Sequence, residues 1–491
     1  MGVSPTVLII TITTYFLLLY AISYFTSKGA DTKTFFNADK QSHWLLVAIG
    51  MIGASLSGAT FISIPGKVGA SGLNMAFSYM QVVMGYLMGY AFIAMVLLPL
   101  YYKLNLLSIY EYLEKRFGVV SYKMGAFFFI ISRIVGASFR LFLMTIVLHP
   151  FVLEPLGVSF EMTILITLIL IWVYTFRGGI KTIVWTDTLQ TVTMLLAVAL
   201  TVYFIIGELN IGFFDIKSEI VKADMSQMFF FENGWADNNN FFKQFLSGAL
   251  ITIVMTGLDQ DMMQKNLTCR SLKDAQKNMF VFSIILVVAN LLFLTLGAML
   301  YIYASQKGIA IPESTDQLYP LIALENLPSF VGIVFIIGLI AAAYSSADSA
   351  LTSLTTSFCI DFLDFQKKER TEKEKRKTRL IVHVAFTVIL FISISIFNQL
   401  NNDAVINNLL KAAGYTYGPL LGLFAFGLFT KLTVKDKWVW IVVLLSPLIS
   451  AYLDLNSETI FNGFKFGFTI LALNGLITFL GLLSLSVKTS K

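Results

Sequence analysis

The chain is poor in charged residues, which make up only 13% of its 491 positions. A soluble domain carries about 25% charged residues, and a water-exposed surface so short of charge would associate through its apolar side chains. Hydrophobic residues make up 57% of the chain, and the mean hydropathy is +0.77. The composition therefore excludes an ordinary soluble domain and indicates that lipid surrounds most of the chain.

Residues that bind transition metals or act as nucleophiles are also scarce. The two cysteines, Cys269 and Cys359, cannot form a disulfide framework, and we expect both to be small buried residues. The three histidines, His43, His149 and His383, lie far apart and never adopt a metal-ligand spacing. An intramembrane enzyme would need a convergent His, Cys or Asp set, so the sequence argues against an enzyme and against a resident transition metal.

What the chain does contain is a series of apolar runs of about 17–28 residues, each long enough to cross about 30 Å of hydrocarbon as a helix. We predict thirteen spans, over residues 5–26, 44–71, 74–100, 124–150, 158–176, 182–207, 241–262, 278–304, 329–360, 380–398, 403–430, 438–453 and 464–486. A short interfacial helix is predicted over 108–117. The fold class is therefore all-α integral membrane protein.

Lysine and arginine gather in alternate connections, which predicts the orientation of the chain. The connection 367–379 holds eight basic residues, and 265–277 holds Lys265, Arg270 and two further lysines. The opposite face has the long connection 209–240, with two lysines among five acids. We expect an uncleaved first span, the N-terminus outside and the C-terminus in the cytoplasm of a cell with an inner membrane. Glutamates interleave the basic run 367–379, so we expect no nucleic-acid partner.

Two spans are built unlike the others. Span 44–71 contains Gly53, Gly58 and the pair Pro65-Gly66, and span 241–262 contains Gly257 followed by acids. Glycine and proline weaken a helix and free backbone carbonyls, which a membrane tolerates only beside protein or a water-lined cavity. Interruptions five spans apart are typical of an inverted repeat of five helices. The alternative is that these small residues let helices pack closely.

Span 329–360 carries a stripe of hydroxyl side chains. Ala342, Ser345, Ser346 and Ser349 recur at i, i+3, i+4 and i+7 and so share one helix face, with Asp348 on its shoulder. An acid inside a membrane helix costs about 2.5–3.5 kcal/mol and needs a cation, a proton or a donor. Carboxylate and hydroxyl oxygens are ligands for a hard cation. The alternative is that the serines bond to their own helix and Asp348 is protonated.

Four further polar residues lie inside apolar spans. Asp187 lies about one and a half turns inside span 182–207, where it is an ion ligand or a group that reaches the membrane surface. Arg133 and Arg140 are seven residues apart on one face of span 124–150, where each meets an anion or helix carbonyls. Lys411 in span 403–430 is a solute contact, a gate or a side chain that reaches the outer surface.

Three segments carry a family resemblance: SGATFISIPGK in span 44–71, YTFRGGIKTIVWTDTLQ entering span 182–207, and AAAYSSADSALTS in span 329–360. They resemble the sodium:solute symporter family, which includes the sodium/glucose, proline, pantothenate, iodide and sialic acid transporters. The resemblance implies a LeuT-type fold, a single transporter domain over 1–491 with five-helix repeats at 44–207 and 241–430. Extra helices at 5–26 and 438–486 flank the two repeats.

The resemblance also implies which residues bind sodium, the coupling ion. The shared sodium site would use backbone carbonyls and two hydroxyls, from Gly53, Leu56, Ala342, Ser345 and Ser346. Some members bind a second sodium, which here would use Asp187, Ser345, Asp348 and Ser349. The sialic acid branch has a serine in place of Asp348, so this acid either strengthens a second sodium site or carries a proton.

The solute is expected beside the interruption of span 44–71. Its candidate contacts are Ser55, Ser57, Thr60, Gln81, Arg133, Arg140 and Lys411. In the sialic acid branch an arginine of the corresponding span pairs with the substrate carboxylate, which favours an anionic or zwitterionic solute. The resemblance does not decide between Arg133 and Arg140.

The sequence therefore predicts sodium-coupled symport of a small polar solute into the cell by alternating access. A proton-coupled symporter of the same fold, or a sugar as the solute, remains the alternative. A membrane sensor would need cytoplasmic kinase modules, and the chain ends shortly after its last predicted span. The expected partners are a small-molecule solute and the lipid bilayer, with no obligatory protein partner.

Overall fold

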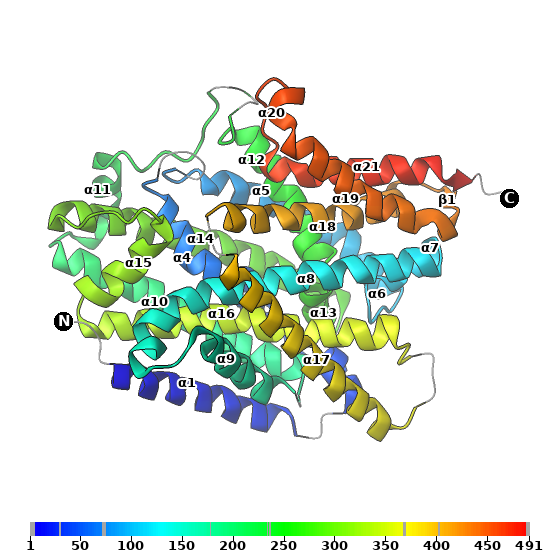
Figure 1. Cartoon of the computed structure of the whole chain (residues 1–491), viewed down its shortest axis with the longest axis horizontal. Coiled ribbons are helices and arrows are strands. Elements are labelled where there is room, and N and C mark those ends of the chain that lie inside the picture. The colour runs from blue at the N-terminus through cyan, green and yellow to red at the C-terminus, as the bar shows by residue number, and fades with distance from the viewer. Residues whose placement is uncertain are drawn as a thin grey trace.

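The protein is described by a computed structural model, which covers residues 5–28, 31–70, 75–176, 178–232, 234, 237–366, 370–400 and 403–487. Helices make up most of this part of the chain, as the apolar runs predicted. The two strands, β1 (Thr433–Val434) and β2 (Ser486–Val487), form a short antiparallel pair. Figure 1 shows long helices running side by side, with α1 starting at one end of the bundle and β1 at the other.

Within the described residues, nine helical stretches are long and apolar enough to cross a membrane. They are α1 (Pro5–Thr26), α5 (Tyr79–Phe92) continued by α6 (Leu98–Lys103), α8 (Val119–Leu148), α10 (Ile180–Glu208), α14 (Leu272–Lys307), α16 (Ser329–Ser357), α17 (Glu372–Gln399), α19 (Val439–Leu455) and α21 (Ile470–Ser484). Two shorter apolar stretches are α9 (Phe160–Thr175) and most of α18 (Asp403–Phe429). The boundaries lie within a few residues of most predicted spans.

Two further spans are broken, as the glycine-rich runs predicted. Helix α3 (Trp44–Ser55) is followed by α4 (Gly58–Lys67) at a bend of 63°. Helix α12 (Phe241–Thr252) continues through a π-turn to Gly257, and α13 (Gln260–Asn266) then departs at 69°. Up to eleven spans result when each bent pair is counted once. The number thirteen and the limits of the two repeats stay predictions.

The first break occupies only part of the glycine- and proline-rich run. The chain leaves the helix at Leu56 and Ser57, whereas Pro65 remains inside α4. Gly66 is needed for packing, because a Cβ there would lie 2.2 Å from the carbonyl oxygen of Thr315. The small residues of this span therefore have both of the expected roles. Those near Leu56 accompany the helix break, and Gly66 lets the segment at Thr315 pack closely.

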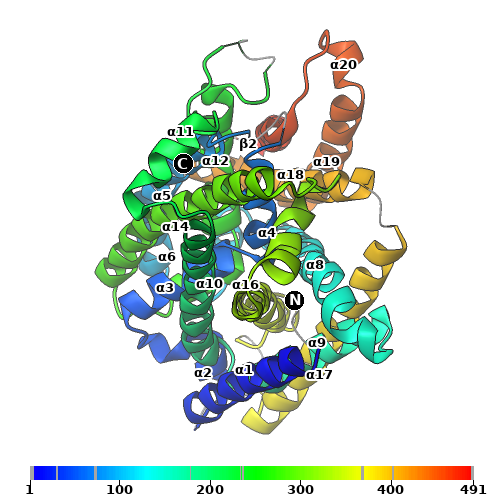
Figure 2. The ribbon, with the colours of Figure 1, turned by 90° about the vertical axis from the view of Figure 1, so that its left-hand side faces the viewer.

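Helix α16 lies at the centre of the bundle. Seen along the bundle in Figure 2, it is viewed end-on and is surrounded by other helices. Helix α10 packs against both α16 and α3, and α5 packs against α12. Helices α1, α9 and α17 pack on one side of this core, and α18, α19 and α21 pack together on the other. The central position explains why nearly every side chain from Leu339 to Ser357 is buried.

The short elements lie at the two ends of the bundle. Helix α7 (Glu111–Arg116), the predicted interfacial helix, lies at the same end as β1 and the start of α17 (Figure 1). Helices α11 (Ile216–Lys222) and α15 (Leu318–Leu321) lie at the opposite end. The remaining short helices are α2 (Thr32–Asn37) and α20 (Ser457–Ile460). The bundle thus presents one end near the basic connections and another near the acidic connection 209–240.

Candidate functional site

The break between α3 and α4 lies against the middle of α16. Helix α3 ends at Ser55, and the N–H of Leu56 donates to the carbonyl of Ile52, so the carbonyls that follow Ile52 lie beyond the last amide of the helix. Gly58 opens α4, and a Cβ at this position would lie 3.3 Å from the Cβ of Ala343. A side chain at position 58 would push the two helices apart. Glycine therefore lets the interrupted backbone approach α16 closely.

Gly53 lies between hydroxyl groups from two helices. Its backbone N–H donates to Oγ1 of Thr191 on α10 at 2.9 Å. A Cβ at Gly53 would lie 2.6 Å from that same oxygen and 2.8 Å from Oγ of Ser345 on α16. The family resemblance implied that Gly53 and Ser345 would belong to one site, and the structure brings them together.

The other predicted ligands on α16 are buried at the same level. Ala342, Ser345 and Ser346 are each at most 1% exposed. The hydroxyl of Ser346 makes only a long hydrogen bond, 3.4 Å to the carbonyl of Ala342. The hydroxyl group is therefore held only weakly by its own helix. The carbonyl and hydroxyl oxygens gathered here are the hard donors that an alkali cation takes.

Asp187 on α10 lies next to Ser345 and accepts hydrogen bonds from α16. Ser345 Oγ donates to its Oδ1 at 2.8 Å, and Ser349 Oγ donates to its Oδ2 at 3.2 Å. Nζ of Lys265, on α13, lies 2.7 Å from the same Oδ2. Each of these side chains is at most 1% exposed. Asp187 is thus a buried anion held by two hydroxyls and an ammonium group, and it does not reach the membrane surface.

Asp348 has a separate set of partners. The hydroxyl of Tyr174 on α9 donates to its Oδ2 at 2.8 Å, and the N–H of Ser349 donates to its Oδ1 at 2.6 Å. The side chain is fully buried. The structure therefore places Asp348 beside the Asp187 cluster without a direct hydrogen bond between the two carboxylates in the described part of the chain.

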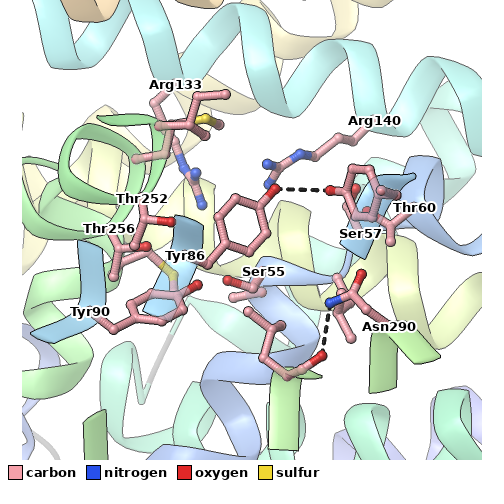
Figure 3. Close-up of a pocket in the computed structure, with 17 residues that line it drawn as sticks. Ser55, Ser57, Thr60, Tyr86, Tyr90, Arg133, Arg140, Thr252, Thr256 and Asn290 are labelled. Carbon is pink, nitrogen blue, oxygen red and sulfur yellow. Dashed lines mark hydrogen bonds between the residues drawn. The ribbon is translucent and has the colours of Figure 1, made fainter. Parts of the chain in front are cut away.

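A cavity of about 190 Å³ opens beside the break, as Figure 3 shows. Five of the predicted solute contacts line it, namely Ser55, Ser57 and Thr60 together with Arg133 and Arg140. Further lining side chains come from α5, α12 and α14, and include Tyr86, Tyr90, Thr252, Thr256 and Asn290. The walls are therefore rich in hydroxyl groups and aromatic rings, which suits a small polar molecule.

Arg133 and Arg140 both reach this cavity from α8 (Figure 3), and Arg133 is neutralised there by acidic side chains. Arg133 forms a close ion pair with Asp261 and lies 3.9 Å from Oδ2 of Asp259. Asp259 also accepts a hydrogen bond of 2.6 Å from the hydroxyl of Tyr417. The guanidinium of Arg133 is therefore part of a buried structural network that holds α8 to the second break.

The described part of the chain offers no carboxylate to Arg140 within ion-pairing distance. Figure 3 shows its guanidinium directed into the cavity, near Tyr86. A cation left without a counter-ion in a membrane protein is costly and is suited to receive an anion. The structure thus distinguishes two arginines that sequence spacing alone could not separate.

Gln81 does not line this cavity, contrary to the prediction. Its Nε2 donates to the carbonyl of Asn239 at 2.9 Å, and its Oε1 accepts from the N–H of Phe230 at 3.0 Å. Both ends of the amide are therefore used to anchor the long connection before α12. The side chain of Lys411, another predicted solute contact, lies outside the described residues.

Sequence reasoning missed three residues of the site. Lys265 was assigned to a basic connection, but it is buried and paired with Asp187. Tyr174 and Thr191 were not singled out, although Thr191 lies one turn after Asp187 on the same helix face. No local pattern marked Tyr174 or Lys265, because their partners are distant in the sequence.

The comparison with known families decides the classification. The model of the sodium:solute symporter family matches residues 35–436. The chain belongs to this family. A family member of this kind is a transporter rather than an enzyme, and the chain is accordingly a multi-pass membrane protein that couples solute symport to sodium.

The sequence of this symporter is similar to those of several named transporters. It is 26% identical to the sodium/sialic acid symporter NanT of Aliivibrio fischeri, over 90% of this chain and 86% of that protein. It is 24% identical to the sodium/sialic acid symporter SiaT of Proteus mirabilis, over 83% of this chain and 81% of that protein. The human sodium/iodide cotransporter is 23% identical over 81% of this chain and 61% of its own length.

A solved structure confirms the fold expected of the symporter. The structure of a Na⁺-coupled sialic acid symporter, described as substrate-bound and outward-open with a novel Na⁺ site, aligns with a TM-score of 0.82. The alignment covers 97% of this chain and 96% of that one at 21% identity. The LeuT-type helical fold is therefore shared, and sodium is the coupling ion of the family to which the chain belongs.

Proposed function

We propose that this sodium:solute symporter imports a small organic carboxylate, anionic or zwitterionic, that binds in the cavity beside the break of α3 and α4. The observation that carries the proposal is the guanidinium of Arg140, which faces the cavity with no carboxylate from the described chain. A carboxylate can meet this fork through two parallel hydrogen bonds. Arg133 is excluded from this role because Asp261 already binds it.

The remainder of the cavity favours a solute with several polar groups. Ser55, Ser57 and Thr60, at and just after the break, line the same cavity as Thr256 and Asn290 from other helices. Each supplies a donor or an acceptor for hydroxyl or amide groups of a ligand. A sugar acid, such as the sialic acid named for two relatives, combines hydroxyl groups with a carboxylate. We therefore take acidic sugars as the first solutes to test.

The same break supplies the proposed sodium site. Backbone carbonyls of Gly53, Leu56 and Ala342, with the hydroxyls of Ser345 and Ser346, would bind one sodium ion. Because Ser55 and Ser57 lie on the same short stretch, an ion that fixes this backbone also fixes the solute-binding side chains. Binding of sodium and of solute is thereby coupled, and each strengthens the other by the same factor.

Transport would follow by alternating access around this midplane site. The bent pairs α3–α4 and α12–α13 are the elements whose halves can move separately, at bends of 63° and 69°. Each sodium that enters across 100 mV releases about 2.3 kcal/mol, which drives the solute uphill. The proposed site is the inner membrane of the cell, with the N-terminus outside and the C-terminus in the cytoplasm. The end that holds α7 and the start of α17 then faces the cytoplasm.

A panel of radiolabelled solutes in proteoliposomes tests the proposal. The panel would contain sialic acid, a small monocarboxylate, a zwitterionic amino acid and glucose, each with an inward sodium gradient and with potassium in its place. We expect sodium-dependent accumulation of a carboxylate and none of glucose. Accumulation of glucose alone would overturn the assignment of Arg140 and favour a sugar transporter.

A further inference from the structure

A lysine is buried next to the proposed sodium site. Lys265 lies in α13, just after the second break, and is 1% exposed. Its Nζ is 2.7 Å from Oδ2 of Asp187. A buried ammonium group needs a paired anion, because transfer of an isolated charge out of water is strongly unfavourable. The pair is therefore a fixed feature of this conformation and joins α13 to α10.

The polar groups around the Lys265–Asp187 pair are carboxylates, hydroxyls and an amide. Asp187 accepts hydrogen bonds from Ser345 and Ser349, and the Gln190 amide lies 3.3 Å from its Oδ1 when oriented to donate. Asp348, the second buried carboxylate on α16, is hydrogen-bonded to Tyr174. Lys265 is the basic side chain of this cluster within the described part of the chain. Its ammonium group thus lies beside Oδ2 of Asp187, one of the oxygens that could serve a second sodium ion.

These oxygens do not fit an additional sodium ion while Lys265 is present. Oδ2 of Asp187 is engaged by the ammonium group, and Oδ1 is engaged by Ser345. A sodium ion on the same carboxylate would also lie close to a like charge, and the repulsion is strong in a buried site. Lys265 and sodium carry the same single charge, so one can replace the other in the charge balance of the cluster.

We propose that the ammonium group of Lys265 takes the place of a second sodium ion, so that this symporter binds one sodium ion per transport cycle. The inference rests on the proposed sodium site at Gly53 and Ser346. A lysine is attached to the chain and cannot be released into the cytoplasm. The second cation position therefore contributes charge and orients Ser345 through Asp187, but it draws no energy from the sodium gradient.

The proposal can be tested by sodium binding alone, without knowledge of the solute. Equilibrium binding of radioactive sodium to the purified full-length protein in detergent gives the number of ions per chain. The wild type is expected to bind one ion, and Ser346→Ala is expected to lose it. Lys265→Met, which is similar in length but uncharged, exposes Asp187 to a free cation and is expected to bind two ions. Lys265→Arg keeps the charge and is expected to remain at one.

The outcomes separate the inference from the function on which it rests. Two sodium ions bound by the wild type, or one ion still bound by Lys265→Met, would overturn the replacement while leaving the shared sodium site intact. No sodium bound by the wild type would contradict the proposed function itself. A melting curve shows whether each variant is folded. If Lys265→Met does not fold, the counts for the wild type and Lys265→Arg decide, since the proposal requires one ion in both.

Discussion

Oγ of Ser345 donates a hydrogen bond of 2.8 Å to Oδ1 of Asp187. This contact links the two halves of the cation-binding region, because Ser345 also faces the backbone of Gly53 at the break of α3. The carboxylate therefore orients a hydroxyl that is itself a proposed sodium ligand. Substitutions on either side of the contact should alter sodium dependence even where they do not touch the solute.

Gly53→Ala is expected to abolish sodium-stimulated uptake. The added Cβ would lie 2.6 Å from Oγ1 of Thr191 and 2.8 Å from Oγ of Ser345, so the break and α16 must move apart. Gly207→Ala is the matched control, since a Cβ at Gly207, near the end of α10, meets no atom within 4 Å. The control should keep its uptake, because the added methyl group displaces no neighbour. Equal loss in both variants would contradict the prediction.

Thr191→Val is expected to weaken sodium binding by removing the acceptor of the Gly53 N–H, which lies 2.9 Å away. Because Gly53 lies within α3, the change removes one hydrogen bond, which is worth about 0.5–1.5 kcal/mol, or roughly a twofold to tenfold loss in affinity if the cost falls on the sodium-bound state. The measurement is the sodium concentration for half-maximal uptake. Thr191→Ser keeps the hydroxyl and should restore the wild-type value, whereas a serine variant as weak as the valine variant would refute the role of this hydrogen bond.

Substitutions of the two arginines are expected to have different effects. Arg140→Gln should raise the KM for a carboxylate solute with little change in melting temperature, because no described carboxylate depends on it. Arg133→Gln should instead lower the stability by about 3–5 kcal/mol, because it leaves Asp261 buried and unpaired. Thermal unfolding and uptake kinetics measured on both variants distinguish the roles. A reversed pattern would show that Arg133 faces the solute.

Gln81→Leu is expected to release the connection before α12 while leaving the solute affinity unchanged. The amide holds the carbonyl of Asn239 and the N–H of Phe230, and leucine can do neither. Limited proteolysis or hydrogen exchange over residues 225–240 should become faster. A raised KM with an unchanged rate of proteolysis would mean that Gln81 acts on the solute after all.

Much of the fold could be predicted from the sequence because lipid imposes a simple rule on helix length. A span such as Ile180–Glu208 is visible as an apolar run, and its limits agree with the prediction to within two residues. The sequence predicted that span 44–71 is interrupted, but it did not show which residue ends the first helix. Pro65, the strongest helix breaker in the run, lies inside α4, and the interruption falls before this helix, at Leu56 and Ser57.

Helix periodicity alone could predict the candidate site only where its residues share one helix face, and the family resemblance was needed to join Gly53 and Asp187 to it. Ser345, Ser346 and Ser349 form such a stripe, and the structure brings Ser345 to Gly53. Lys265 could not be found in this way, because it lies in a polar run after an apolar one and looks like part of a basic connection. Its partner Asp187 is 78 residues away in the sequence, so only the packing of α13 on α10 brings the two charges together.

The most direct test of the sodium site is the melting temperature of the purified protein as sodium replaces potassium at constant ionic strength. A ligand that binds only the folded state stabilises it by about 2.7 kcal/mol at a hundred times its Kd. The melting temperature of the wild type should therefore rise and saturate with sodium, and that of Ser346→Ala should not change. A wild type that melts alike in both salts, or a variant that still responds fully to sodium, would contradict the assignment of Gly53, Ser345 and Ser346 as the site of the coupling ion.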